Sequence, residues 1–349
     1  MRCRPSLLLV LSRSLPALLL VALVAGCSGG KENTADPGND GEDRPTVAFV
    51  TNQVATFWDI AAAGARDAGR DNDVEVEVRF PSEATVTVQK QVTEDLLNAG
   101  IDALAISPLD AENQIDMLNQ WGQDIPLITH DSDAPKSERL FFIGVDNYAA
   151  GRTIGQMIRE ALPEGGEVIV CIGRLQQDNA RKRRQGVIDE LLDRSDDETR
   201  FDDPEQEVSG NGFRILTTLT DGGSESVALQ KAEDAINAYP DLDCFVGLFV
   251  YNPVACLTAV KKSGRDDILI AGFDEADDTL QGIRDGTIIG TVSQNPYQYG
   301  YQSVEMLADI VRGGTPQPEN GYVPVDAIAV TRDNVDEFEA ELEARLGSR

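Results

Sequence analysis

The chain has 349 residues and carries 60 acidic against 30 basic side chains, which gives a formal net charge of −30. This excess of acids excludes the basic surface that nucleic-acid binding requires. The length is sufficient for two lobes with separate hydrophobic cores after an N-terminal leader is set aside.

The first 27 residues have the pattern of an exported lipoprotein. Three arginines precede an apolar run over residues 15–24, which is short for a membrane span, and small residues then lead to Cys27. We expect residues 1–26 to be a lipoprotein signal peptide, with an uncleaved anchor as the alternative. Cys27 would carry the lipid that anchors a periplasmic protein to a membrane, and the polar residues 27–44 would form a flexible tether.

Strands and helices alternate through the first half of the remaining chain. Apolar runs bounded by turn residues predict the strands, and amphipathic spacing predicts the helices. The expected strands are 46–51, 74–79, 103–107, 126–129 and 141–145, and the expected helices are 57–70, 85–99 and 111–122. Such alternation predicts a parallel sheet with right-handed crossovers.

The second half repeats this alternation. Its expected helices are 149–162, 181–193 and 224–238, and its expected strands are 167–172, 214–219 and 287–293. The charged residues 195–212 predict a surface loop. The helix expected over 297–312 comes after all the strands and helices of the second half, so we expect the chain to cross back to the first half there. Residues 336–349 predict a surface helix.

One pattern occurs in both halves, over residues 98–133 and 237–277. Each copy has a helix end, a buried strand, a turn, an amphipathic helix and a second strand that stops at Asp131 or Asp274. Ligands of open α/β sheets bind beyond the carboxyl ends of the strands. We therefore expect two doubly wound parallel-sheet lobes, with the two aspartates on opposite lips of a cleft that captures a small polar molecule.

The sequence offers little for catalysis or metal binding. Cys171, Cys244 and Cys256 have no metal-ligand spacing, and the first two lie in apolar strand runs as buried residues. A disulfide between Cys244 and Cys256 would join opposite ends of a sheet and is not expected. No nucleophile elbow or phosphate loop is present, and His130 is the single histidine, so we expect no cofactor, no metal and no enzymatic activity.

The segments TVAFVTNQVATFW, PLITHDSD, NARKRRQG, LIAGFDEADD and GTVSQNPYQYGYQSVEML resemble the periplasmic sugar-binding proteins of ABC importers, in the ribose-binding-like branch of the type I fold. The resemblance implies a monomer that delivers a sugar to an ABC permease in the membrane. It also implies a three-crossing hinge near residues 145–146, 294–295 and 325–326. The N-terminal lobe would then be 45–145 plus 295–325, and the C-terminal lobe 146–294 plus 326–349.

In the first lobe, the resemblance implies that Asn52, Phe57, Trp58 and Asp131 bind the ligand. Aromatic faces suit the apolar C–H face of a sugar. Core packing is the alternative for the two aromatic residues, but adjacent helix positions point in different directions, so we expect that they do not both face the core. The resemblance also places Ser132 among the ligand-binding residues, at a position where the family usually has an arginine. The absence of the arginine's fork of donors disfavours ribose itself as the ligand.

In the second lobe, the resemblance implies binding by Arg183, Asp274 and the hinge residue Gln294. A cleft asparagine falls within 249–252, and we choose Asn252 because its amide both donates and accepts hydrogen bonds. The alternative for Asp274 is a helix N-cap before Ala276. For His130, a structural role is favoured, because its side chain should point away from that of Asp131.

Two other functions remain open at this stage. One is a ligand-sensing subunit whose closed form is read by a membrane receptor, as in autoinducer-binding members of this superfamily. The other is a carbohydrate-active enzyme with Asp131 and Asp274 as an acid and base pair. If the two lobes move relative to each other, the two carboxylates are poorly preorganised for catalysis, which argues against the enzyme.

Overall fold

The computed structural model describes residues 44–316 and 318–346. The expected signal peptide, the lipid site at Cys27 and almost all of the expected tether lie outside these residues. No helix within the described ranges is long and apolar enough to cross a membrane.

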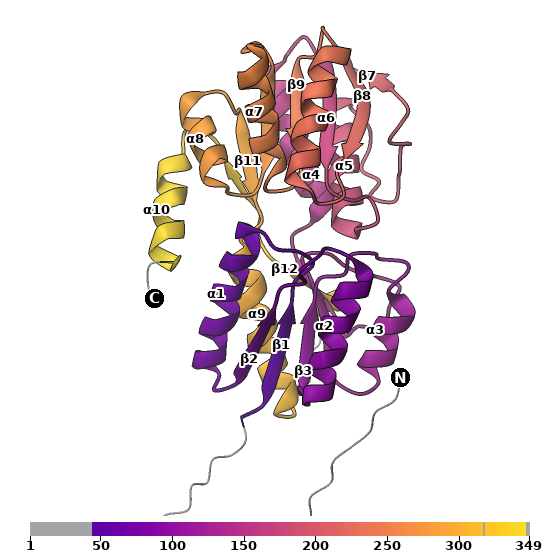
Figure 1. Cartoon of the computed structure of the whole chain (residues 1–349), viewed down its shortest axis with the longest axis vertical. Helices are drawn as coiled ribbons and strands as arrows, with labels where there is room; N and C mark the ends of the chain where they lie inside the picture. Colours follow the sequence, from indigo (N-terminus) through magenta and orange to yellow (C-terminus); the bar gives the residue numbers. More distant parts are fainter. Residues whose placement is uncertain (1–43, 317, 347–349) are drawn as a thin grey trace, which may run out of the picture. The chain divides into compact units, whose positions relative to one another are not determined.

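The first sheet has six strands in the order β12-β5-β4-β3-β1-β2, and every neighbouring pair is parallel. Its strands are β1 (Thr46–Val50), β2 (Glu75–Arg79), β3 (Ala103–Ile106), β4 (Leu127–His130), β5 (Phe142–Gly144) and β12 (Tyr322–Pro324). The helices α1 (Thr56–Asp71), α2 (Val86–Ala99), α3 (Ile115–Gly122) and α9 (Pro296–Val311) belong to this half of the fold (Figure 1). The parallel sheet predicted for residues 46–145 is therefore confirmed.

The second sheet has seven strands in the order β13-β11-β10-β9-β6-β8-β7. Its strands are β6 (Gly166–Ile172), β7 (Val208–Gly210), β8 (Phe213–Thr220), β9 (Cys244–Gly247), β10 (Leu269–Phe273), β11 (Gly290–Ser293) and β13 (Ile328–Val330). Its helices are α4 (Asn147–Ala161), α5 (Asp178–Leu191), α6 (Glu225–Ala238), α7 (Asn252–Ser263) and α8 (Asp277–Asp285). The central pairs are parallel, whereas both edge strands, β7 and β13, are antiparallel and were not predicted.

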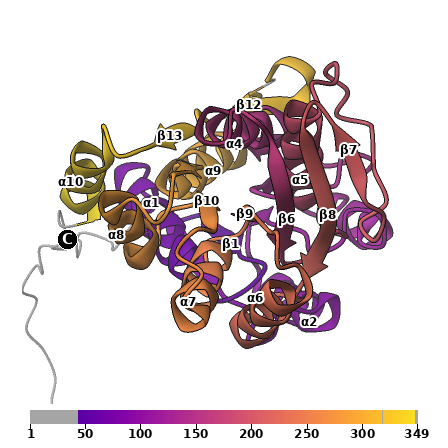
Figure 2. The same cartoon turned by 90° about the horizontal axis from the view of Figure 1, so that it is seen from above.

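The chain passes between the two sheets three times. The passages lie between β5 and α4, between β11 and α9, and between β12 and β13. After the second passage, α9 runs beside α1, more than 200 residues earlier in the chain, and Tyr297 Oη donates to Asp67 Oδ2 at 3.0 Å (Figure 1). The last helix, α10 (Val335–Leu346), lies beside α8, where Arg284 Nε and Asp336 Oδ1 are 2.7 Å apart (Figures 1 and 2).

Helices α4 and α5 pack with their backbones in close contact. A Cβ atom on Gly151 of α4 would overlap the carbonyl of Arg183, and one on Gly186 of α5 would overlap the carbonyl of Tyr148. A side chain at either position would push the helices apart, so glycine is required for this approach. The contact fixes where α5 presents Arg183.

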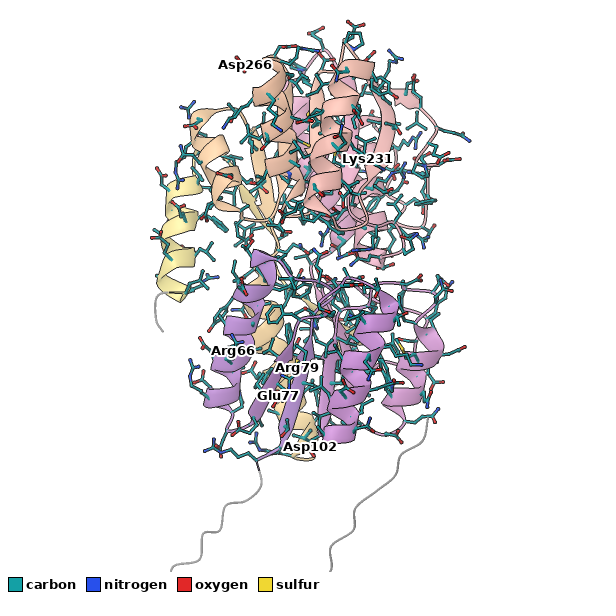
Figure 3. The ribbon with its side chains drawn as sticks, in the orientation of Figure 1. Arg66, Glu77, Arg79, Asp102, Lys231 and Asp266 are labelled. Carbon is teal, nitrogen blue, oxygen red and sulfur yellow. The ribbon has the colours of Figure 1, made fainter. Side chains whose placement is uncertain are left out.

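Charged side chains cover the outside of the fold. Figure 3 labels Arg66 and Asp266, both exposed, and the pair Glu77 and Arg79 on β2, whose Oε2 and Nη1 atoms are 2.5 Å apart. Pairs of this kind are half exposed and contribute at most about 1 kcal/mol each. Stability therefore depends on the apolar faces of the two sheets.

Candidate functional site

The two aspartates of the repeated pattern occupy equivalent positions. Asp131 follows β4 and Asp274 follows β10, and both have left-handed backbone conformations, with φ of 59° and 66°. Aspartate tolerates this conformation better than most residues. The backbone N–H of Asp131 donates to the carbonyl of Ile143 at 3.1 Å, and that of Asp274 to the carbonyl of Val292 at 2.9 Å. Each aspartate is thus held against the strand that leads into a passage between the sheets.

Both aspartates line one pocket, which contains about 310 Å³ of space not filled by protein atoms, open solvent included. The lining residues are Asn52, Gln53, Phe57, Trp58, Asp131, Gln177, Asn179, Arg183, Phe249, Val250, Asp274 and Gln294. They come from segments on both sheets. Of the residues chosen from the sequence, Ser132 and Asn252 are not in this lining.

Asp131 accepts hydrogen bonds from both halves of the fold. Its Oδ2 accepts from Ser107 Oγ at 2.9 Å and from Asn52 Nδ2 at 3.3 Å. Its Oδ1 accepts from Asn179 Nδ2 at 3.2 Å and lies 3.6 Å from Arg183 Nη2. Burial raises the pKa of Asp131, and the positive charge of Arg183 opposes this rise.

Arg183 is 2% exposed, and its guanidinium contacts several backbone and side-chain acceptors. Its Nε donates to Asn147 Oδ1 at 2.8 Å and its Nη1 to the carbonyl of Leu248 at 3.3 Å. Its Nη2 donates to Gln294 Oε1, and the guanidinium lies over the ring of Phe273 at 4.3 Å from the centroid. Through these contacts the guanidinium of Arg183, which lies on α5, connects α4, the ends of two strands and the second passage.

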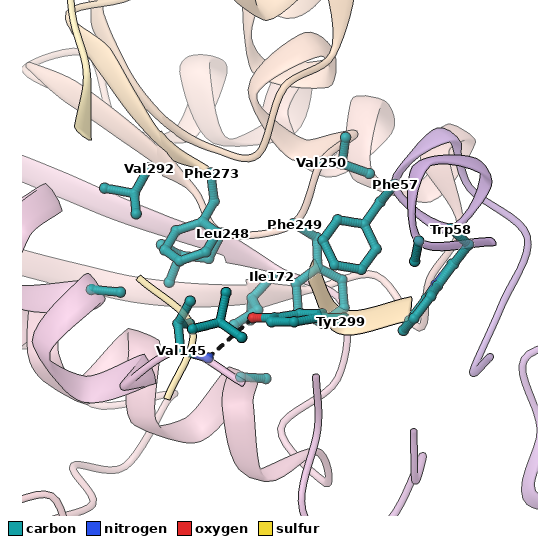
Figure 4. Close-up of a cluster of buried hydrophobic side chains, with 14 of the residues drawn as sticks. Phe57, Trp58, Val145, Ile172, Leu248, Phe249, Val250, Phe273, Val292 and Tyr299 are labelled. Atoms are coloured by element: carbon teal, nitrogen blue, oxygen red, sulfur yellow. Dashed lines mark hydrogen bonds between the residues drawn. The ribbon is translucent and has the colours of Figure 1, made fainter. Parts of the chain in front are cut away.

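Gln294, in the passage between β11 and α9, connects this cation to Asp274. Its Nε2 donates to Asp274 Oδ1 at 2.9 Å, and its Oε1 accepts from Tyr299 Oη at 3.1 Å. Tyr299 Oη in turn accepts from the backbone N–H of Val145 at 3.2 Å (Figure 4). Asp274 does not cap α8, whose N-cap residue is Ala276 without a side-chain hydrogen bond.

Phe57 and Trp58 form an aromatic wall in the first turn of α1. Their ring centroids are 4.8 Å apart at an interplanar angle of 90°, and Phe57 also lies edge-on to Tyr299 at 6.0 Å (Figure 4). Both side chains line the pocket, and both also belong to the main hydrophobic core. The expectation that they do not both face the core is therefore wrong, because residues of this core also line the pocket.

Comparison with known proteins identifies the family. A model of the periplasmic binding protein domain matches residues 47–315. The chain belongs to the periplasmic binding protein family. The ribose import binding protein RbsB of Escherichia coli (strain K12) is 27% identical over 242 residues, covering 68% of this chain and 74% of that protein.

Two further proteins are similar to this binding protein over most of its length. The xylitol-binding protein of Mycolicibacterium smegmatis is 24% identical over 298 residues, which cover 84% of this chain and 79% of the relative. The solved structure of an ABC transporter solute binding protein from Burkholderia graminis, in complex with D-arabinose, has a TM-score of 0.75 and 26% identity, covering 83% and 96% of the two chains. The type I fold expected from the sequence is confirmed. These relatives are named for ribose import, xylitol binding and solute binding, in agreement with the prediction of a binding protein rather than an enzyme.

Two of the sequence-predicted residues of the binding protein, Asn252 and Ser132, are buried outside the pocket lining. Asn252 is fully buried at the start of α7, where its Oδ1 accepts from the backbone N–H of Phe249 at 3.0 Å and its Nδ2 donates to Asp221 Oδ2 at 2.8 Å. It thereby holds the turn that brings Phe249 and Val250 into the lining. Ser132 is also fully buried, and its Oγ has no hydrogen-bond partner among the described residues.

His130 is packed into the core behind the pocket. Its ring stacks on Phe49 at 4.1 Å between centroids and meets Trp58 edge-on at 5.6 Å. Burial lowers the pKa of His130 to about 3, so the imidazole is neutral at pH 7.

The sequence reasoning missed five lining residues, which are Gln53, Gln177, Asn179, Phe249 and Val250. The helix expected from residue 181 begins at Asp178, which places Asn179 in its first turn. Asn179 and Arg183 are four residues apart and share a helix face, a spacing that could have identified Asn179. Phe249 and Val250 follow the end of β9 at Gly247.

The side chains of the pocket offer hydrogen-bond donors and acceptors beside aromatic rings. The described residues contain no group of three or more His, Cys, Asp or Glu side chains that could hold a metal ion. The pocket combines carboxylate acceptors, amide groups and one guanidinium with aromatic rings. This combination suits a small ligand with several hydroxyl groups and an apolar face.

Proposed function

We propose that this protein is an extracytoplasmic solute-binding protein that closes around a monosaccharide or related polyol and delivers it to an ABC permease. The observation that carries the proposal is the placement of Asp131 and Asp274, from different sheets, in one pocket with Arg183 and the aromatic pair Phe57 and Trp58. Relatives named for ribose import and xylitol binding, and one solved with D-arabinose, support this ligand class.

The pocket suits a hinged closing mechanism. Ionised carboxylates accept strong hydrogen bonds from sugar hydroxyls, and aromatic rings cover the C–H face of the sugar. Arg183 is near Asp131 of the first sheet and binds Gln294 in a passage, so its contacts span both halves. Lobes joined by short passages close around a ligand that contacts both, and the closed form is what a permease would bind.

A thermal-stability screen of the purified protein against pentoses, hexoses and polyols tests this function. We expect at least one compound, at 100 to 1,000 times its dissociation constant, to raise the free energy of unfolding by roughly 3–4 kcal/mol. Asp131→Ala should abolish the shift, whereas Asp203→Ala, in an exposed loop, should retain it. If no compound stabilises the wild-type protein, the proposal is wrong.

We also propose that Cys27 carries a lipid that anchors the mature protein to a membrane, on the strength of the leader pattern before it. Cys27→Ser removes the thiol that the lipid would modify. We expect the wild-type protein in the membrane fraction of the expressing bacteria, labelled by a fatty-acid probe, and the variant unlabelled. A variant that still incorporates the fatty-acid probe would contradict lipidation at Cys27.

A further inference from the structure

The pocket contains more negative than positive charge. Among its described lining residues, Asp131, Asp274 and Arg183 are the ionisable side chains, so two carboxylates face one guanidinium. All three are at most 4% exposed. A buried charge without a partner is costly, because the surroundings cannot replace its hydration. The closed pocket therefore requires one more positive charge, or one proton, for balance.

Of the two carboxylates, Asp274 is the one without a cationic nitrogen within ion-pair distance among the described residues. Asp131 has the guanidinium of Arg183 at 3.6 Å and accepts hydrogen bonds from three other side chains. Asp274 receives its hydrogen bonds from Gln294 alone among the described residues, through a neutral amide at 2.9 Å. Its oxygens thus have neither a cationic partner in contact nor a full set of donors.

Among the described residues that line the pocket, Arg183 is the one cationic side chain, and its charge acts on both Asp131 and Asp274. Arg139 pairs with Asp133, where Nε and Oδ1 are 2.5 Å apart, and Lys182 pairs with Asp178 at 3.1 Å between Nζ and Oδ2. Arg174 is not in the lining and donates to the carbonyl of Gly222. Burial lowers the pKa of Arg174, and the negative charge of Asp221 opposes this fall. The neighbour of Asp274 in the chain, Glu275, is another acid, and the buried Ser132 after Asp131 is uncharged.

We propose that the pocket selects a sugar or polyol that carries one protonated amino group, and that this ammonium group pairs with Asp274. The proposal rests on the proposed function and narrows its ligand class. A neutral sugar would supply hydroxyl donors but would leave the excess charge in place. An ammonium group supplies three donors and the missing positive charge at the carboxylate of Asp274. It would also screen the repulsion between Asp274 and Asp131 across the pocket.

Calorimetric titration of the full-length protein with matched compounds tests the proposal at pH 7. Each set contains a neutral compound, its amino-deoxy counterpart and the N-acetyl derivative, which keeps the nitrogen but removes the charge. The probes are the D-glucose, D-galactose and D-mannose sets, together with inositol and sorbitol and their amines. We expect the tightest ligand to be an amine, with a dissociation constant at least about tenfold below those of its neutral and N-acetyl partners.

Two variants place the effect at Asp274. In Asp274→Asn, the dissociation constant of the neutral compound divided by that of the amine should fall toward one. Asp278 is an exposed residue on α8, and Asp278→Asn should keep the wild-type ratio. A neutral compound that binds wild type as tightly as its amine overturns this proposal and leaves the proposed function standing. Binding of no compound from any set, together with no stabilising compound in the screen of pentoses, hexoses and polyols, overturns both.

Discussion

Replacing Arg183 with alanine is expected to weaken ligand binding by about 100-fold or more and to lower the free energy of unfolding by about 3–5 kcal/mol. The side chain is 2% exposed, so alanine leaves a cavity as well as uncompensated acceptors. Asp131 loses its cationic neighbour, and Asn147, Leu248 and Gln294 each lose a donor. Calorimetry with a ligand found in the stability screen measures the first effect, and urea unfolding measures the second.

The same helix provides a control for Arg183. Arg181 is partly exposed, and its guanidinium lies over the exposed ring of Phe201 at 5.2 Å. Arg181→Ala should leave affinity unchanged and change stability by no more than about 0.5 kcal/mol. Arg183→Lys keeps the charge but loses the planar fork, so we expect affinity between those of wild type and Arg183→Ala. Wild-type affinity in Arg183→Ala would show that the guanidinium does not contribute to binding.

The stability of the ligand-free protein is expected to fall as the pH rises from about 5 to 8, and Glu275→Gln should remove much of this fall. Burial raises the pKa of Glu275 from its ordinary value of 4.5 to about 8, and repulsion by Asp274 adds to the rise. Both of its carboxyl oxygens lack a hydrogen-bond partner among the described residues. Burial likewise raises the pKa of Asp274 to about 7, opposed by Arg183.

The direction follows from proton binding. The folded protein keeps a proton on Glu275 up to about pH 8, whereas the unfolded chain releases it near pH 4.5. The folded state therefore binds more protons in this window, and raising the pH removes stability, here on the order of a few kcal/mol. His130 acts in the opposite sense at lower pH, because its lowered pKa makes the unfolded chain bind the extra proton below pH 6.5.

Urea unfolding at pH 5, 6, 7 and 8 measures this effect. Wild type and Glu275→Gln are compared at each pH, so that the contribution of His130 cancels. Glu337→Gln, at an exposed position on α10, is the matched control and should follow the wild-type profile. Parallel profiles for wild type and Glu275→Gln would mean that Glu275 does not hold a proton in the folded state.

The two aspartates show which part of the pocket could be predicted from local sequence patterns. A buried strand that stops at an aspartate occurs twice, and the carboxyl ends of parallel strands gather at one edge of a sheet, which predicts that both residues face a pocket. The resemblance added Arg183 and Gln294, which line the same pocket. Asn179 was missed because the start of α5 was placed three residues late.

The alternation of strands and helices, the parallel centres of both sheets and the place of the two aspartates at strand ends were predictable from the sequence, because burial on one face repeats with a local period. Tertiary structure alone decided that Arg183 lies beside Asp131 of the other half, that Asn252 supports the pocket wall rather than lining it, and that β12 and β13 join different sheets. These outcomes depend on hydrogen bonds and packing between residues far apart in the chain. A local sequence pattern contains no information about such contacts.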